Sequence, residues 1–362
     1  MSPFSGPAQY VTISGVLFWA FRGKGVESVI SPMQDKETNN ESVSAVIPVY
    51  NGAGFIHRAL DSVLAQTHPV EQIIVVDDGS TDKTASAVSE YGGRVEYIYQ
   101  PNAGAAAARN TGIRAVRGDW VAFLDGDDEW LPDRLARQFE LVCKYPELAW
   151  ISGNFLRSSQ GESGAHADPA RAARWWGETD TPRRFFEAFA QDLWGCTDTM
   201  LIRRSVFDEV GLFSEDLRRA NDIDMWFRIA YRHPQIAYVA EPLAVYHLDT
   251  AGSIVKTSTR APVLAKFIER HLELSQQAGA FNEFCPVARR LLRQWIRGML
   301  FAGQGQDARQ LLGGFKSLLP LHYRLGMGLA TRFPRTTAGA LRLGGKGARR
   351  VGLGRKVDRP RN

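Results

Sequence analysis

The chain has 362 residues, enough to bury one large α/β domain together with an appendage, and its formal net charge of +5 is mild. Hydrophobic residues make up 44% and charged residues 23%, as in ordinary folded soluble proteins, so composition indicates a globular chain and separates no class of function from another. The three cysteines stand far apart, which excludes a cysteine metal motif and favours a reducing, cytoplasmic compartment.

Residues 1–42 show no regular pattern, and we expect an irregular N-terminal extension there. Residues 11–21 are apolar, but this stretch is well short of the roughly 20 residues that cross a bilayer, and no positive charge precedes it. It therefore matches neither a transmembrane helix nor a signal peptide. Met33 stands just before a polar run, and a native start there is a hypothesis that the sequence leaves open.

From residue 44 onward, short apolar segments alternate with amphipathic ones. We expect strands at 44–49, 72–76, 95–99 and 120–124, and helices at 55–66, 83–91 and 103–116. Strands that alternate with helices at this spacing are joined by right-handed crossovers and form a parallel sheet covered on both faces. The predicted fold class is therefore α/β, with a Rossmann-like, mostly parallel sheet.

Unusual polar clusters follow three of these strands. The clusters are Pro48-Val49-Tyr50-Asn51, Asp77-Asp78-Gly79-Ser80 and Asp125-Gly126-Asp127-Asp128. Ligands bind to such sheets outside the carboxyl ends of the strands, near the point where strand order reverses, so we expect the clusters to meet at one edge. No glycine-rich dinucleotide loop and no P-loop follows the first strand, which disfavours those modes of phosphate binding.

The third cluster places Asp125, Asp127 and Asp128 within four positions, where their charges repel each other. A divalent cation that holds a phosphate would compensate them, since Mg²⁺ and related ions take carboxylate and substrate oxygens. A solvated acidic loop before a helix is the alternative, and it would be favoured for an isolated Asp-x-Asp pattern. Arg109, on the third expected helix, would either reach a diphosphate or pair with an aspartate at a strand end.

Four motifs together resemble, in order and spacing, the family 2 inverting glycosyltransferases of the GT-A fold. These motifs are Pro48-Val49-Tyr50-Asn51, Val75-Val76-Asp77-Asp78-Gly79-Ser80-Thr81-Asp82, Asn102-x-Gly104 with Ala108-Arg109-Asn110-x-Gly112, and Phe123-Leu124-Asp125-Gly126-Asp127-Asp128-x-Trp130. The resemblance covers about residues 44–253. It implies a GT-A type domain at 43–260, with a nucleotide-binding half at 43–130 and an acceptor half at 131–260.

For the donor nucleotide, the resemblance implies contacts from Asp125, which lies by the ribose, and from five further residues. Pro48 and Tyr50 would begin the pocket, with Tyr50 packed on the base. Asp78, with Asp77 beside it, matches the carboxylate that hydrogen-bonds the base. Arg109 matches a position near the nucleotide.

For the metal, the resemblance implies that Asp125 lies by the ribose while Asp127 holds Mn²⁺ or Mg²⁺ on the diphosphate. Asp128 would share the metal or the hydroxyls of the donor sugar. A later segment departs from the family's Tyr-Arg-x-His-x-Gly-Ser pattern, because Asp249 stands where the histidine is expected and His247 lies two positions earlier. His247 is therefore a secondary candidate ligand, with a structural histidine as the alternative.

The candidate general base lies in Asn221-Asp222-Ile223-Asp224-Met225-Trp226-Phe227-Arg228. This segment resembles the family's Glu-Asp-x-(Asp/Glu)-Leu-Trp-x-Arg, whose second acid is the base, and Asp222 occupies that place. Asn221 replaces the preceding Glu, which removes a neighbouring charge. The alternative for Asp222 is a helix N-terminal acid favoured by the helix dipole.

The resemblance thus implies inverting transfer of a sugar from a nucleoside-diphosphate sugar to an acceptor hydroxyl, in the synthesis of a bacterial surface polysaccharide or glycolipid. A nucleotidyltransferase is the alternative enzyme, but it would carry a basic, glycine-rich loop after the first strand, where this chain has Pro48 to Gly52. A non-catalytic nucleotide-sugar-binding module is a further alternative. The presence of all the acids, including Asp222, argues against it.

After residue 260, helical patterns at 265–277, 287–302 and 307–319 predict a helical appendage spanning 261–321. Residues 322–362 form a basic tail in which eleven Lys and Arg residues stand against the single acid Asp358. This tail would be a solvated, disordered end, or it would rest on the anionic inner face of the plasma membrane, which suits a lipid-linked acceptor. No recognisable nucleic-acid-binding module is present in the sequence.

Overall fold

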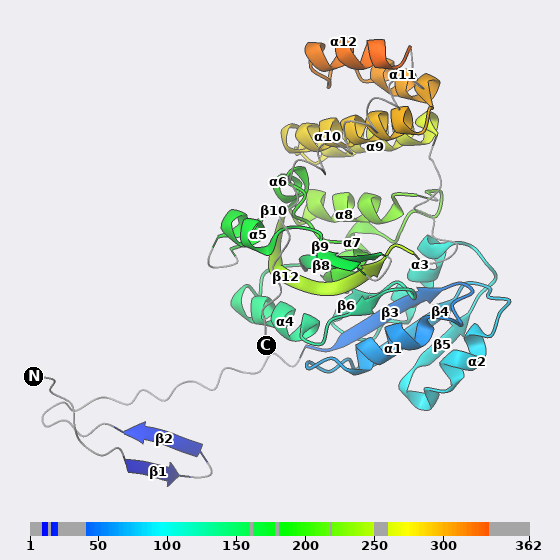
Figure 1. Cartoon of the computed structure of the whole chain (residues 1–362). Helices are drawn as coiled ribbons and strands as arrows, with labels where there is room; N and C mark the ends of the chain where they lie inside the picture. The colour runs from blue at the N-terminus through cyan, green and yellow to red at the C-terminus, as the bar shows by residue number, and fades with distance from the viewer. Residues whose placement is uncertain are drawn as a thin grey trace, which may run out of the picture. The chain divides into compact units, whose positions relative to one another are not determined.

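The computed structural model describes residues 9–13, 16–20, 41–159, 162–177, 181–217, 219–249 and 260–332 (Figure 1). Met33 and the basic residues beyond 332 lie outside the described ranges. The chain divides into two compact units, Met1–Asn40 and Glu41–Asn362.

The first unit contains an antiparallel hairpin. Its strands are β1 (Gln9–Ile13) and β2 (Val16–Ala20), with Gln9 opposite Ala20 and Ile13 opposite Val16. For these segments the expectation of an irregular extension is wrong. Both strands are rich in β-branched and aromatic residues, which favour extended backbone.

The second unit is built on a sheet of ten described strands in the order β10-β12-β8-β11-β6-β3-β4-β5, with β7 paired to β12 and β9 to β8. Its first half is parallel and consists of β3 (Val43–Val49), β4 (Gln72–Asp77), β5 (Glu96–Tyr99) and β6 (Trp120–Phe123). Every residue of β3, β4 and β6 is buried, as expected for strands covered on both faces.

Three helices cover this half on opposite faces (Figure 1). They are α1 (Ile56–Leu64), α2 (Thr84–Ser89) and α3 (Ala105–Ala115), and a short 3₁₀ turn, η1 (Gly92–Arg94), precedes β5. Val46 and Ile74 pack in one core cluster with α3, whereas Ala45 and Ile73 pack in the other with α1 and α2. The predicted α/β architecture with helices on both faces is confirmed.

The other half of the sheet is mixed. Its strands are β7 (Glu129–Trp130), β8 (Trp150–Ser159), β9 (Glu162–Ala165), β10 (Arg183–Arg184), β11 (Leu201–Arg203) and β12 (Gln235–His247). β11 runs antiparallel to both β6 and β8, so it joins the two halves. Helices α4 (Arg134–Lys144), α5 (Pro169–Trp176), α6 (Phe185–Ala190), α7 (Val206–Val210) and α8 (Asn221–Arg232) connect these strands, and a 3₁₀ turn, η2 (Thr197–Thr199), precedes β11.

Four helices follow the sheet: α9 (Ala261–Gln277), α10 (Phe281–Phe301), α11 (Gly305–Gly314) and α12 (Leu321–Ala330). α10 begins before the predicted residue 287 because Pro286 lies inside the helix and does not start it. Most of α12 belongs to the part that the sequence assigns to the basic tail, so for residues 322–330 a disordered end, one of the two alternatives, is not observed. Its leucines recur every fourth residue, a helical period that the basic composition of the following residues obscures.

The appendage shares its core with the sheet domain. α9 packs on α8 and α10 packs on α6, and Phe227, Phe267 and Phe284 are all buried in one cluster at this junction. In the part of the chain that the structure describes, we find no helix with the length and apolar character that crossing a membrane requires.

Candidate functional site

The carboxyl end of β6 and the start of β11 bring two acids together that are far apart in sequence. Because β11 is antiparallel to β6, with Leu201 opposite Ala122, the residues before β11 lie beside those that follow β6. The side chain of Asp198 is 1% exposed, and its Oδ1 accepts a hydrogen bond of 2.8 Å from the main-chain N–H of Asp125. Asp198 was not among the residues predicted from the sequence, because the antiparallel pairing of β11 with β6 joins distant segments and leaves no pattern in the local sequence.

Asp125, Asp128 and Asp198 each offer a carboxylate oxygen, and these oxygens lie within 4.8 Å of one another. Asp128 is fully buried; its Oδ1 accepts a 2.7 Å hydrogen bond from the main-chain N–H of His247, while its Oδ2 has no hydrogen-bond partner among the described residues. Burial, with the nearby acids, raises the pKa of Asp128 to about 11. Burial and then Asp125 raise the pKa of Asp198 to about 7. Crowded, desolvated oxygens with one unused acceptor suit a hard cation.

The other two predicted metal ligands lie differently. Asp127 is half-buried and stands outside this trio, and its main-chain carbonyl accepts a hydrogen bond from Arg58. The imidazole Nε2 of His247 lies 3.1 Å from Glu129 Oε1. The pairing of β7 with β12 sets Glu129 opposite Val245, so the main chain of His247, and not its ring, meets Asp128. Among the described residues, the close group of oxygens therefore joins Asp128 to Asp125 and Asp198, whereas the side chains of Asp127 and His247 lie outside it.

Arg109 on α3 connects the acid cluster to the candidate base. Its side chain is 7% exposed, Nη2 donates to Asp125 Oδ1, and Nη1 donates to Asn221 Oδ1 at 3.4 Å. Burial lowers the pKa of its guanidinium, but the carboxylates of Asp125, Asp222 and Asp198 outweigh burial and leave the pKa above its usual value. One buried cation thus compensates acids from the end of β6, the start of β11 and the start of α8.

Asp222 lies in the first turn of α8 and is half-buried. Its Oδ1 accepts a 2.8 Å hydrogen bond from the N–H of Ile223, and burial raises the pKa of its carboxyl group while Arg109 opposes that rise. A carboxylate with a raised pKa is a stronger proton acceptor once ionised. Asn221, which replaces the family's Glu, gives Arg109 an acceptor oxygen without adding a charge.

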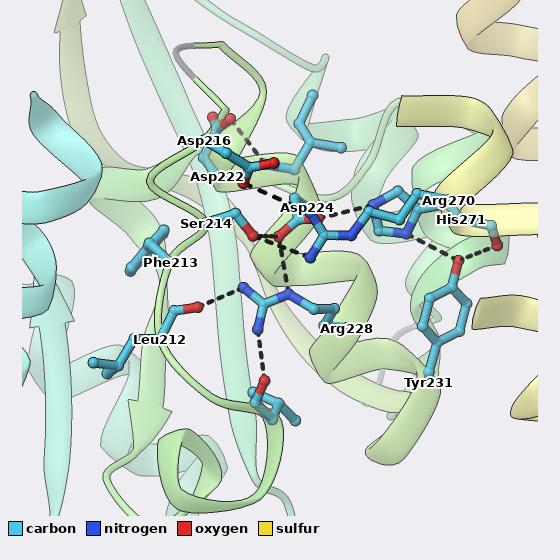
Figure 2. Close-up of polar contacts among 12 residues, drawn as sticks. Leu212, Phe213, Ser214, Asp216, Asp222, Asp224, Arg228, Tyr231, Arg270 and His271 are labelled. Atoms are coloured by element: carbon cyan, nitrogen blue, oxygen red, sulfur yellow. Dashed lines mark hydrogen bonds and ion pairs between the residues drawn. The ribbon is translucent and has the colours of Figure 1, made fainter. Parts of the chain in front are cut away.

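Two residues further along α8, Asp224 is fully buried and holds the first turn of the helix in place (Figure 2). Its Oδ2 accepts hydrogen bonds from Ser214 Oγ at 2.7 Å and from Arg228 Nε at 2.9 Å. Its Oδ1 lies 3.2 Å from His271 Nε2 and 3.5 Å from Arg270 Nη1, both on α9. Burial raises the pKa of Asp224, but these partners, His271 first among them, outweigh it and lower the pKa to about 2.

His271 is itself fully buried, and burial lowers the pKa of its imidazole below 6.5. Its Nδ1 lies 3.3 Å from the hydroxyl of Tyr231, which also donates to the His271 carbonyl at 3.1 Å. In a neutral imidazole that is protonated at Nε2 toward Asp224, Nδ1 is an acceptor, and the single hydroxyl proton of Tyr231 is shared between Nδ1 and the His271 carbonyl. The appendage therefore contacts the helix that carries Asp222 through a buried polar network.

Asp77, the last residue of β4, and Asp78, which follows it, are both buried, and their hydrogen bonds are to other residues of the chain. Asp78 Oδ1 accepts from Gln100 Nε2 at 2.7 Å and from the N–H of Ala103 at 2.9 Å, and its Oδ2 accepts from the N–H of Gly104 at 2.8 Å. Asp77 accepts from the Ser80 N–H and from the Tyr97 hydroxyl. These bonds fix the loops at the ends of β4 and β5.

The remaining predicted nucleotide contacts flank those loops. Pro48 is buried within β3, paired with Val76, whereas Tyr50 is 52% exposed just after the strand. The main-chain N–H of Asn51, at a φ of 50°, donates to Ser80 Oγ and thereby joins the first two polar clusters. The predicted convergence of the strand ends is thus observed, with Tyr50 as the exposed ring.

The comparisons with known proteins agree with this geometry. A family model described as Glycosyl transferase family 2 matches residues 44–211. A protein named uncharacterized glycosyltransferase EpsJ, from Bacillus subtilis (strain 168), is 30% identical over 240 residues, which are 65% of this chain and 68% of EpsJ. An uncharacterized glycosyltransferase of Rickettsia typhi is 33% identical over 195 residues, and the match spans 53% of this chain but only 60% of that relative.

The crystal structure of Staphylococcus aureus TarS 1-349 in complex with UDP superposes with a TM-score of 0.60 at 17% identity, over 84% of this chain and 92% of that chain. At this identity the likeness shows a shared fold. The family model and the relatives establish that the chain belongs to glycosyl transferase family 2, and the likeness to TarS shows the GT-A fold.

Proposed function

We propose that this protein is an inverting glycosyltransferase that moves a sugar from a nucleoside-diphosphate sugar to an acceptor hydroxyl. The observation that carries the proposal is the position of Arg109, which contacts Asp125 of the acid cluster and lies within electrostatic reach of Asp222. Donor-side acids and a candidate proton acceptor thus share one buried cation. TarS has been crystallised with UDP and with UDP-GlcNAc, which supports a nucleotide-sugar donor.

The acceptor class rests on a relative. A Bacillus subtilis protein named putative teichuronic acid biosynthesis glycosyltransferase TuaG is 29% identical over 238 residues, and the match spans 88% of TuaG. We therefore place the reaction in surface polysaccharide or glycolipid synthesis, with a saccharide or lipid-linked acceptor.

For the donor nucleotide, Tyr50 offers an exposed ring for the base beside the buried Asp77 and Asp78. A carboxylate has about four acceptor sites, and the described side-chain contacts of Asp78 use three of them. The remaining site would accept a hydrogen bond from an N–H of the base. Pro48 would support Tyr50 from within β3.

A divalent ion fits the acid cluster, because three oxygens lie close together and Asp128 Oδ2 has no partner among the described residues. Asp125, Asp128 and Asp198 would hold Mg²⁺ or Mn²⁺, with Asp127 as a further ligand on the diphosphate side. When bound, the ion supplies Lewis-acid stabilisation of the negative charge that develops on the leaving diphosphate.

The chain's own residues perform the proton transfer. Asp222 would accept the proton of the attacking hydroxyl at Oδ2, since its Oδ1 already accepts from the N–H of Ile223. Arg109 keeps Asp125 in place and favours the ionised form of Asp222 that this step requires. A single displacement from the face opposite the diphosphate inverts the anomeric centre.

The test is a transfer and donor-hydrolysis assay over a panel of UDP-, GDP- and dTDP-sugars with Mn²⁺, in which wild-type protein releases nucleoside diphosphate. Asp222→Asn should abolish transfer while thermal stabilisation by the donor is retained. Near-normal turnover by this variant would refute the assignment of the base. Release of pyrophosphate would identify a nucleotidyltransferase, and stabilisation without any release would identify a binding module.

A further inference from the structure

We infer that α12 and the basic residues around it form a surface that binds anionic lipid bilayers by lying in their interface. Three leucines of this helix, Leu321, Leu325 and Leu329, are 61%, 63% and 64% exposed. They are spaced four residues apart, so they lie on one face of the helix. Leu64, the other exposed leucine of the described chain, is only 37% exposed, so the three form an unusual apolar stripe.

α12 packs on α11, and no residue of α12 is fully buried (Figure 1). An open groove of about 390 Å³ lies between the two helices, and its lining includes Leu321, Leu325 and the cations Arg309, Lys316 and Arg324. The groove therefore combines apolar and basic side chains, the composition of helices that lie in a lipid interface.

The charge around the stripe has one sign. Residues 305–332 carry Arg309, Lys316, Arg324 and Arg332, and their only acid is Asp307. The side chain of Asp307 is 13% exposed and pairs with Arg260 at 3.3 Å, so it neutralises none of the four. Residues 333–362 add nine Lys and Arg residues and one acid to the sequence.

This charge pattern distinguishes the occupants that an apolar stripe could accept. A second copy of the chain would bring two basic surfaces together, and the chain's own residues 333–362 carry the same charge, so both meet repulsion. Nucleic acid would satisfy the cations but leave the leucines in water. A bilayer with anionic headgroups accepts both, since leucines enter the acyl boundary while Arg and Lys side chains reach the phosphates.

The experiment is flotation of full-length protein with phosphatidylcholine vesicles and with vesicles that also contain phosphatidylglycerol, at low and at high salt. We expect wild-type protein to float with the anionic vesicles at low salt. The variant Leu321→Ser/Leu325→Ser/Leu329→Ser should bind at least about tenfold more weakly. Lys316→Gln/Arg324→Gln should lose about fivefold per cation at low salt, and less at high salt.

The matched control is Leu64→Ser/Val263→Ser, which removes exposed apolar side chains from α1 and α9 and should float like wild type. Circular dichroism confirms that each variant is folded, as expected for substitutions at exposed positions. Wild-type protein that fails to float, or a triple leucine variant that floats undiminished, overturns the inference. A dimer in analytical ultracentrifugation that the leucine substitutions dissolve would also overturn it, by assigning the face to a second copy. None of these readouts depends on glycosyl transfer.

Discussion

Replacing Asp224 by Asn should lower the free energy of unfolding by about 2 kcal/mol at pH 7. The carboxylate is fully buried among Ser214, Arg228 and His271, and these contacts hold its pKa at about 2 against a usual 3.8. At about 1.4 kcal/mol for each unit of pKa, the folded state therefore favours the charged form by roughly 2 kcal/mol. An amide keeps the shape of the side chain but not its charge, so Arg228, whose side chain is 13% exposed, loses its anionic partner.

The assay is urea unfolding followed by tryptophan fluorescence. Because the pKa of Asp224 is lowered on folding, its contribution is fully present above pH 4 and is lost only as pH falls toward 2. The difference between wild type and Asp224→Asn should therefore stay constant from pH 7 to 8. Below pH 6.5 the difference should grow, because Asp224 raises the pKa of the contacting His271 and its removal lowers that pKa further. Because burial lowers the pKa of His271, protonation of the imidazole favours the unfolded protein. His271 therefore reduces the stability of wild type as pH falls below 6.5.

Asp216→Asn is the matched control, because Asp216 lies 4.0 Å from the same Arg270 but its side chain is 60% exposed. Exposed pairs contribute little, so this variant should stay within about 0.5 kcal/mol of wild type. If Asp224→Asn cost less than about 1 kcal/mol, or no more than the control, the argument that buried charge compensation fixes the start of α8 would be refuted.

Two further predictions concern the site, and a third concerns the loop that precedes η2. Mn²⁺ and donor should stabilise wild type against heat, and EDTA should remove that stabilisation. Asp198→Asn should weaken it. If Asp198→Asn were fully stabilised while Asp127→Asn lost the stabilisation, the result would favour the ligands that the family resemblance implies. Arg109→Lys should lower kcat/KM at least about tenfold in the transfer assay, because an ammonium group lacks the planar guanidinium that reaches both Asp125 and Asn221. If the variant kept the activity of wild type, a positive charge alone would be sufficient at this position. Gly195→Ala should cost about 2 kcal/mol or more in urea unfolding, because φ is +89° and the new Cβ would lie 2.7 Å from the carbonyl oxygen of Gly153; an unchanged midpoint would contradict this packing.

The first half of the fold could be predicted from sequence because its signals are local. Parallel strands buried on both faces appear as short apolar runs, and their polar ends mark the binding edge of the sheet. The expected strand at 72–76 and helix at 103–116 correspond to β4 and α3, within one or two residues at each end. Elements of this kind need no knowledge of distant partners.

The parts that could not be predicted depend on pairing between distant segments. Asp198 enters the acid cluster only because β11 is antiparallel to β6, and His247 turns its ring to Glu129 only because β12 pairs with β7 in one register. The contact of His271 with Asp224 requires α9 to pack on α8. Side chains positioned by such tertiary contacts carry no periodic signal that a single sequence can reveal.

The position of β11 at the seam has a consequence for biosynthesis. During translation, the four motifs up to residue 130 are made first, whereas Asp198 is added much later and Asp222 later still. The first turn of α8 lacks the buried contact between Asp224 and His271 until His271 has left the ribosome. We therefore expect the buried contacts between α8 and α9 to form only after His271, nearly three quarters of the way along the chain, has left the ribosome.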